Sequence, residues 1–360
     1  MNKHLLLLFI AFIVSSITKA REIKPGFDKQ EYTTLLKLYD HFQLRNDSLR
    51  SDDFGYKLVY ESEEIGLANK WWLWRKDKTA VIGIRGTEGS GVSWLANIYA
   101  AMIPAKGTLR LSENDRFEYS VAEDPKAAVH VGWMISTAYL SREIVPKIDS
   151  LYTLGVKAIF IQGHSQGGSI SFLLTSHLLK LQETGAIPSD IKFKTYASAA
   201  PKPGNLYYAY DLEYKTRNGN LFSVINTADW VPEVPFSIQT FADFNTINPF
   251  TNMDSFIKKQ SFFKRIFINR YYKRLRNPLA KSQKRFEAIL GHKVYGMVEK
   301  QLKDLQEPTY SNSNNFTRIG HTIIFHPDDA YYNIFQQDKS VFINHQRKAY
   351  LYLAEKYTEK

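Results

Sequence analysis

One pentapeptide constrains this chain more than any other feature: residues 163–167 read Gly-His-Ser-Gln-Gly and fit the pattern G-x-S-x-G. An apolar, β-rich run over residues 157–162 leads into it, and residues 167–181 have a helical pattern. A strand, a tight turn and a helix in this order predict a strained elbow that exposes Ser165 at the carboxyl edge of a sheet. Neighbouring backbone crowds such a turn, so small residues are needed at Gly163 and Gly167.

The order of the other segments predicts a mostly parallel central sheet flanked by helices. Two apolar runs, 71–74 and 79–84, bracket a charged turn and indicate a hairpin. Further apolar runs at 193–197 and 221–225 end in small or turn-forming residues, which suits strands that are buried on both faces. This alternation is typical of an α/β fold, and the elbow narrows it to the α/β-hydrolase fold.

We expect residues 21–360 to form one such domain, because α/β folds commonly reach this length as a single unit. With 44% hydrophobic and 14% aromatic residues, the chain has ample material for a buried core. The strand and helix rhythm is broken from about residue 235 to residue 315, where aromatic and basic residues are frequent. We interpret this stretch as an insertion that packs on the sheet domain.

Residues 1–20 have the layout of a signal peptide. A basic start at Lys3 precedes an apolar run over residues 5–14, and the small residues Thr18 and Ala20 suit cleavage before Arg21. The run is short for a bilayer span, so an uncleaved anchor is the weaker alternative. We therefore expect a secreted or periplasmic protein. The chain has no cysteine, which excludes disulfides, thiol catalysis and cysteine-ligated zinc.

A serine hydroxyl is a weak nucleophile near neutral pH and needs a histidine base that is oriented by an acid. In α/β-hydrolases both follow the serine along the chain. Asp229 is the best acid, because its short loop follows the run 221–225 and therefore lies at the same sheet edge as Ser165. Asp211 and Asp243 lack a strand leading into them.

The choice of histidine is less determined, since His292, His321, His326 and His345 all follow the acid. We choose His345, because it lies near the chain end, where the last catalytic loop belongs, and precedes an apparent terminal helix. His164 is too close to Ser165 on the elbow to act as its base.

The tetrahedral intermediate of such a reaction needs two hydrogen-bond donors, which form an oxyanion hole. One is the backbone N–H of Gln166, directly after the serine. The other is expected from Thr87, because Arg85-Gly86-Thr87 follows the strand 79–84 and offers a glycine beside a hydroxyl. This chemistry requires no cofactor and no metal.

Together these residues resemble the class 3 lipases, the fungal triacylglycerol lipase-like family of α/β-hydrolases. The pieces that match, in the family's order, are Arg85-Gly86-Thr87, residues 129–132, 163–168 and 226–232, and His345 with Tyr350. The resemblance implies that Ser165 is the nucleophile, Asp229 the acid and His345 the base, with Thr87 and Gln166 as the oxyanion hole.

The resemblance also implies a lid helix within residues 89–104. Trp94, Leu95 and Ile98 of this stretch have the spacing of one apolar helix face. An ordinary core helix has the same spacing, so periodicity alone does not separate the two interpretations.

The net charge of +11 is concentrated in one segment. Residues 251–300 contain 13 Lys or Arg and 3 Asp or Glu, a net of 13 − 3 = +10. Residues 256–285 interleave aromatic and basic side chains in an amphipathic pattern that suits peripheral contact with an anionic lipid surface. A cap helix with a solvated basic face explains the pattern as well. We expect a monomer that does not bind nucleic acid.

The sequence therefore predicts a serine carboxylic-ester hydrolase with acyl lipids as substrates. A phospholipase A1 or galactolipase, a short-chain esterase and a polysaccharide-ester esterase remain open. The alternative from another class is a non-catalytic lipid-binding module on a lipase-like scaffold.

Overall fold

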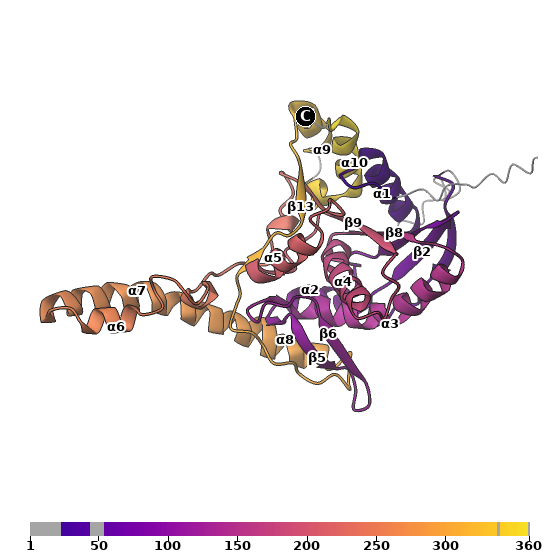
Figure 1. The fold of residues 1–360 in the computed structure, drawn as a ribbon. Helices are drawn as coiled ribbons and strands as arrows, with labels where there is room; N and C mark the ends of the chain where they lie inside the picture. The colour runs from indigo at the N-terminus through magenta and orange to yellow at the C-terminus, as the bar shows by residue number, and fades with distance from the viewer. Residues whose placement is uncertain (1–22, 44–53, 337–338, 359–360) are drawn as a thin grey trace, which may run out of the picture.

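The computed structural model describes residues 23–43, 54–336 and 339–358, so the predicted signal peptide lies outside the described residues. A seven-stranded sheet forms the centre of the molecule, with the order β1, β2, β3, β8, β9, β11, β13 (Figure 1). Its strands are β1 (Lys57–Glu61), β2 (Trp71–Lys76), β3 (Thr79–Ile84), β8 (Ala158–His164), β9 (Lys192–Ser198), β11 (Leu221–Asn226) and β13 (His321–Phe325).

Two antiparallel pairings begin the sheet and four parallel pairings complete it. β1 pairs with β2 and β2 with β3 in antiparallel fashion, with Trp71 opposite Ile84 in the β2–β3 hairpin. Every pairing from β3 through β13 is parallel. The predicted hairpin, the mostly parallel sheet and the α/β-hydrolase fold are confirmed.

Both faces of the sheet are buried, and each has its own hydrophobic core. Along β3, Ala80, Ile82 and Ile84 belong to one core, whereas Val81 belongs to the other. Along β8, Ile159 and Phe160 are divided in the same way. Successive side chains of a strand point to opposite faces, so a run of apolar residues is what a sheet covered on both sides requires.

Helices from distant parts of the chain provide the two covers. Residues of α3 and α4 pack in one core, and residues of α1, α9 and α10 pack in the other. Figure 1 shows α1 and α10 side by side, although they come from opposite ends of the chain. The helices that surround the sheet are α1 (Lys29–Gln43), α3 (Val131–Thr153), α4 (Gln166–Glu183), α5 (Leu206–Lys215), α9 (Asp329–Phe335) and α10 (Arg347–Lys356).

A buried ion pair fixes α1 to the sheet. The Lys194 Nζ of β9 lies 2.6 Å from the Glu31 Oε2 of α1, and the Lys194 side chain is fully buried. The Tyr196 hydroxyl donates to the same Glu31 oxygen at 2.8 Å. Breaking such a buried pair leaves an uncompensated charge, so this contact fixes the position of α1 over the sheet.

A second sheet and a separate hairpin were not predicted. Four short antiparallel strands form the second sheet in the order β12, β10, β7, β4, and β5 pairs with β6. The strands of the second sheet have only two or three residues each, too few to show the alternation that identifies a strand. These strands are β4 (Met102–Pro104), β5 (Lys106–Arg110), β6 (Arg116–Ser120), β7 (Ala128–His130), β10 (Gly204–Asn205) and β12 (Phe316–Thr317).

The insertion does not pack on the sheet domain as expected. Figure 1 shows α6 (Met253–Lys258) and α7 (Phe262–Phe286) extending away from the body as an arm. At about 1.5 Å per residue, the 25 residues of α7 are about 37 Å long. Gln283 is its one buried residue. The expectation is wrong for these two helices, because apolar side chains along α7, Phe263 and Phe267 among them, are exposed instead of packed on the body.

The chain returns to the body after the arm. A π-helical turn, η4 (Glu287–Lys293), leads into α8 (Val294–Val298), whose Val294 and Val298 are buried in the core. Short 3₁₀ segments occupy Val231–Glu233, Phe241–Asp243 and Ile343–His345. Among the described residues, no helix combines the length and the apolar character needed to cross a membrane.

Candidate active site

The elbow between β8 and α4 holds Ser165 in a backbone conformation that non-glycine residues rarely adopt, with φ 62° and ψ −132°. A side-chain carbon added to Gly163 would lie 2.2 Å from the Gly167 carbonyl oxygen, and one added to Gly167 would lie 2.3 Å from the Ile84 oxygen. Only glycine fits at either position without moving backbone. The turn is therefore as crowded as the sequence pattern predicts, and it presents Ser165 at the carboxyl end of β8.

The structure brings Asp229 and His345 together from elements 116 residues apart. Asp229 follows β11, and His345 ends the 3₁₀ turn η5 (Ile343–His345). The His345 Nδ1 lies 2.7 Å from Asp229 Oδ2, the Asp229 side chain is fully buried and that of His345 is 11% exposed. The Val231 N–H donates to the other carboxylate oxygen at 3.0 Å. This arrangement leaves the Nε2 of His345 as the ring nitrogen that is free to act on another group.

The remaining sequence candidates lie elsewhere. Asp211 forms an ion pair with Lys215, and Asp243 accepts hydrogen bonds in the capping box of a 3₁₀ turn. His292 contacts Glu307 on the insertion. His321 begins β13 and His326 directly follows it; both are exposed, and neither lines the pocket that contains Ser165.

Tyr350 contacts the acid directly. Its hydroxyl donates to Asp229 Oδ2 at 2.7 Å from within α10. Burial and the neighbouring carboxylate raise the pKa of Tyr350 well above its ordinary value, so the hydroxyl keeps its proton and acts as the donor. The sequence suggested this residue only through the family resemblance. The Oδ2 atom of Asp229 therefore contacts two donors, the Tyr350 hydroxyl and His345 Nδ1. These contacts fix the orientation of the His345 ring.

His164, beside the serine, fixes the backbone of His345. Its Nε2 lies 2.7 Å from the His345 carbonyl oxygen, so this nitrogen carries the hydrogen and donates it. Its Nδ1 lies 3.1 Å from the Ser198 hydroxyl, which in turn contacts the Tyr32 hydroxyl at 2.8 Å. Burial lowers the pKa of His164 well below its ordinary value, which keeps the ring neutral. Sequence reasoning excluded His164 as a base but missed this positioning role.

The loop after β3 brings Thr87 to the same pocket. The Asn97 Nδ2 donates to the Thr87 Oγ1 at 2.8 Å, which leaves the Thr87 hydroxyl hydrogen free to point elsewhere. Gly86 N–H donates to the Tyr39 hydroxyl of α1. Gln166 is the first residue of α4, where backbone N–H groups have no partner within the helix. Thr87 and Gln166 thus both offer unused donors beside Ser165.

Two buried residues, His130 at the end of β7 and Trp133 of α3, hold Asn97 in place. The Trp133 Nε1 donates to Asn97 Oδ1 at 3.0 Å, and the His130 Nε2 lies 3.1 Å from the Asn97 carbonyl oxygen. The Nδ1 of His130 accepts from the Trp133 N–H at 3.3 Å and caps the helix. Burial lowers the pKa of His130 to about 3, so the ring is neutral and its Nε2 donates. The sequence singled out His130 only as part of the matching stretch 129–132, without a role, and missed Asn97 and Trp133. Together the three residues support Thr87.

The predicted lid stretch contains α2 (Gly91–Ile98), which is half buried. Leu95 packs against the core, whereas Trp94 and Ile98 are 41% and 40% exposed. A side-chain carbon on Gly132 of α3 would lie 2.2 Å from the Ala96 carbonyl oxygen, so the two helices are in close contact. Trp94 is the member of the predicted lid set that lines the pocket. A movement of α2 stays a prediction.

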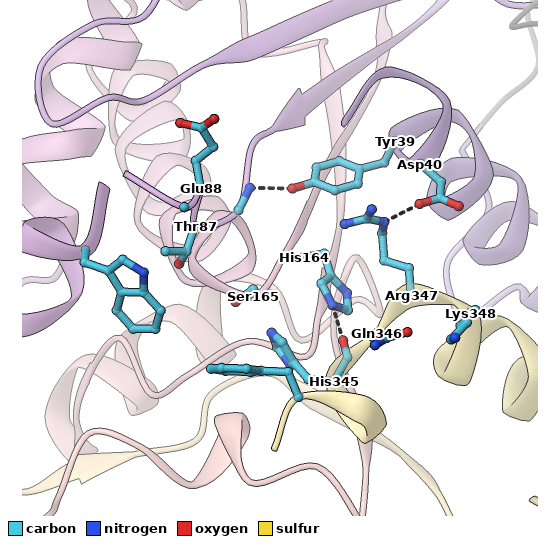
Figure 2. A pocket seen from close by; sticks show the side chains of 14 residues that line it. Tyr39, Asp40, Thr87, Glu88, His164, Ser165, His345, Gln346, Arg347 and Lys348 are labelled. Atoms are coloured by element: carbon cyan, nitrogen blue, oxygen red, sulfur yellow. Dashed lines mark hydrogen bonds and ion pairs between the residues drawn. The ribbon is translucent and has the colours of Figure 1, made fainter. Parts of the chain in front are cut away.

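These elements enclose one cavity of about 410 Å³ around Ser165. Figure 2 shows the side chains of Ser165 and His345 facing one another, with Thr87 and Glu88 on one side and Asp40, Arg347 and Lys348 on the other. No hydrogen bond joins Ser165 to His345 within the described part of the chain. Among these residues there is also no cluster of three or more His, Asp or Glu that would suit a metal ion.

Comparisons with known proteins extend over part of the chain. Residues 81–239 match the family model described as Lipase (class 3), a range that includes Thr87, Ser165 and Asp229 but ends before His345. No curated relative matches the chain.

Solved structures with a similar fold include three fungal lipases. The lipase propeptide complex of Rhizomucor miehei is 18% identical, with 59% of this chain and 65% of that one covered and a TM-score of 0.44. The lipase of Rhizopus microsporus var. chinensis is 18% identical, with 59% of this chain and 71% of that one covered and a TM-score of 0.42. The Lip2 lipase of Yarrowia lipolytica is 19% identical, with 60% and 77% covered and a TM-score of 0.44. The chain thus spans just under two thirds of the Rhizomucor protein.

The neutral state of His130 predicts a specific loss of stability in acid. The folded-state pKa of about 3 lies below the unfolded value of about 6.5, so this histidine contributes stability above pH 6.5 that is lost as the pH falls towards 3. Linkage gives a loss of about 2 kcal/mol between pH 8 and pH 5. We expect His130→Asn, which retains a capping oxygen, to be less stable at pH 8 but to show a flatter pH dependence.

Urea unfolding at several pH values measures this difference. His164 and His177 have lowered pKa values too, so the wild-type protein and the variant should both retain part of the slope. Parallel pH profiles for the two proteins would contradict a neutral, buried His130.

Proposed function

We propose that this protein, a lipase-type serine ester hydrolase whose residues 81–239 match the class 3 lipase family, cleaves acyl esters of lipids with Ser165, Asp229 and His345. The observation that carries the proposal is the 2.7 Å contact between His345 Nδ1 and the buried Asp229, with His345 lining the same pocket as Ser165. An acid that orients one nitrogen of a histidine leaves the other to accept the serine proton.

The proposed reaction has two steps. The Ser165 Oγ attacks the carbonyl carbon of the ester while its proton passes to His345 Nε2, and the alcohol leaves after His345 returns that proton to it. Water then attacks the acyl-serine ester while His345 takes one proton from it. His345 passes this proton to the Ser165 Oγ as the acyl–oxygen bond breaks, and the carboxylic acid and free Ser165 are released. Hydrogen bonds in such sites tighten when substrate binds, so the missing bond between Ser165 and His345 does not oppose this role.

Stabilisation of the oxyanion is assigned to Thr87 and Gln166. The Gln166 backbone N–H belongs to the residue after the nucleophile, the usual position for this donor. Because Asn97 donates to the Thr87 oxygen, the Thr87 hydroxyl keeps its own hydrogen for the oxyanion. Loss of one such donor typically costs roughly 3 kcal/mol of transition-state stabilisation.

The lining of the pocket favours an apolar acyl group. Trp94 and Phe342 line it with ring centroids 6.5 Å apart, and Trp230 lies 5.4 Å from Phe342. Such aromatic surface can bury a hydrocarbon chain. We therefore place lipid esters ahead of polysaccharide esters as substrates. The alternative activities of a phospholipase A1, a galactolipase or a short-chain esterase would differ from the proposed lipase only in the ester that is preferred.

Hydrolysis of p-nitrophenyl esters from acetate to palmitate tests the proposal. We expect long-chain esters to be cleaved, and Ser165→Ala to lower kcat by about 10⁴-fold or more because no other group forms the acyl intermediate. Ser150→Ala, at an exposed hydroxyl of α3, serves as the matched control and should retain full activity.

Two outcomes would contradict this proposal. Activity confined to acetate and butyrate would replace the lipase with a short-chain esterase. A folded protein that cleaves no ester would favour the non-catalytic lipid-binding module.

We further propose that the α7 arm binds an anionic lipid surface. Phe263, Phe267, Tyr271 and Leu275 recur every fourth residue, so they form one ridge along the helix, and each is at least 50% exposed. The helix contains nine Lys or Arg and no Asp or Glu. Aromatic side chains at the level of the headgroups, with cations on the phosphates, are the usual basis of peripheral membrane binding. In this proposal the protein is a monomer and binds no nucleic acid.

Reversal of the arm's charges tests this contact. We expect Lys264→Glu/Arg270→Glu/Arg274→Glu to weaken binding to vesicles of phosphatidylglycerol and phosphatidylcholine by about 100-fold or more, since each cation near the surface contributes about 1 kcal/mol. Co-sedimentation with these vesicles measures the loss, and turnover of a soluble ester should be unchanged.

The matched control reverses three exposed lysines of the body, Lys57, Lys192 and Lys339. Equal weakening by the control, or unaltered binding of the arm variant, would contradict a role for the arm.

Export is proposed from the sequence of residues 1–20, which predicts a signal peptide. A secreted or periplasmic location would place the enzyme with extracellular or envelope lipids.

A further inference from the structure

The pocket around Ser165 is asymmetric. Trp94 of α2, the helix whose Asn97 contacts Thr87, gives it an apolar lining beside Thr87, whereas Asp40, Arg347 and Lys348 give it a charged lining. Figure 2 shows Ser165 between Thr87 and these charged residues. A single substrate that fills the cavity therefore meets an apolar surface at one end and a charged surface at the other.

The chemistry of the proposed reaction decides which part of the substrate faces the charged end. His345 returns its proton to the departing alcohol, so the alcohol part of the ester must lie on the side of His345. Gln346, Arg347 and Lys348 follow His345 directly in the chain and line the pocket there. The acyl part is left with the side of the pocket that contains Thr87 and Trp94.

Arg347 is held so that its guanidinium group faces the pocket. Its Nε donates to Asp40 Oδ1 at 2.6 Å, its guanidinium lies 5.2 Å from the centre of the Tyr39 ring, and its side chain is 12% exposed. Within the described residues, no hydrogen bond engages its two terminal nitrogens. Asp40 thus orients the guanidinium group through its Nε atom. The two terminal nitrogens remain available as the planar pair of N–H donors that binds phosphate or carboxylate.

Lys348 adds a second positive charge at this end. Its side chain is exposed, and it forms no ion pair with any residue in the described part of the chain. Asp40 compensates Arg347, and Glu88 lies on the far side of Ser165, 4.0 Å from Arg85. The charge of Lys348 is therefore uncompensated where the alcohol part would lie.

We propose that Arg347, assisted by Lys348, binds an anionic group on the alcohol part of the ester. This inference rests on the proposed ester hydrolysis and names its substrate class: acyl esters of alcohols that carry a phosphate or a carboxylate. The guanidinium donates two hydrogen bonds to the anion, and the lining beside Trp94 receives the acyl chain. Neutral esters of the same size lack the anion and bind less well.

Matched pairs of soluble esters test the preference without a membrane. Dihexanoyl phosphatidylglycerol is compared with dihexanoylglycerol, and O-butyryl lactate with O-butyryl lactamide, all below the concentrations at which they aggregate. The measured quantity is the ratio of kcat/KM for the anionic ester to kcat/KM for the neutral one. We expect the ratio to exceed one for at least one pair in the wild-type protein.

Variants assign the preference to Arg347. We expect Arg347→Gln to lower the ratio roughly tenfold to a hundredfold, mainly through KM, because a charge-assisted hydrogen bond is lost. Arg347→Lys keeps the charge but not the paired donors, so its ratio should lie between those of the wild-type protein and Arg347→Gln. Lys348→Gln should lower the ratio less than Arg347→Gln does. The control Lys356→Gln lies on the same helix and contacts Asp328 outside the pocket, so it should not change the ratio.

The outcomes separate the anion sources and the two proposals. If the ratio depends on Arg347 only in the phosphate pair, the anion is that of a phospholipid headgroup. If the ratio depends on Arg347 only in the lactate pair, the anion is a carboxylate. Either result supports the inference. Ratios that are equal with and without Arg347, in variants with a wild-type melting temperature, overturn it while ester hydrolysis stands. If the wild-type protein cleaves no member of either pair, ester hydrolysis itself fails, and this inference with it.

Discussion

The close approach of backbone at the elbow is the constraint on which the candidate site depends. Gly163 and Gly167 allow β8 and α4 to meet without side chains between them, and this contact holds Ser165 at a positive φ. A larger residue at either glycine would move the helix from the sheet, and with it the Gln166 N–H. The proposed nucleophile and one of the proposed oxyanion donors are thus positioned by the same close packing.

The other groups of the site are each held by a neighbouring side chain that takes no part in the proposed reaction. Tyr350 orients Asp229, His164 fixes the backbone of His345, and Asn97 fixes Thr87. Their anchors come from α10, β8 and α2, which belong to different parts of the fold. Because of this preorganisation, the donors can stabilise a developing charge without first reorienting. Such electrostatic preorganisation accounts for most of the rate enhancement of such sites.

The sequence predicted what depends on local pattern and missed what depends on distant contacts. The elbow, the hairpin and the central strands follow from apolar runs and glycines, and Asp229 and His345 from their places after β11 and near the chain end. The contact between Asp40 and Arg347 joins residues 307 positions apart, and no local pattern indicates it. The arm was misjudged for a related reason: an amphipathic pattern shows that a helix has two faces but not what covers the apolar one.

Covalent labelling of the folded protein with a fluorophosphonate, followed by mass spectrometry of its peptides, tests the central claim most directly. The account predicts a single adduct, located on Ser165 and absent from Ser165→Ala and from heat-unfolded protein, because only the assembled site activates this hydroxyl. Absence of an adduct from folded protein, or an adduct on another residue, would contradict the claim that Ser165 is the nucleophile.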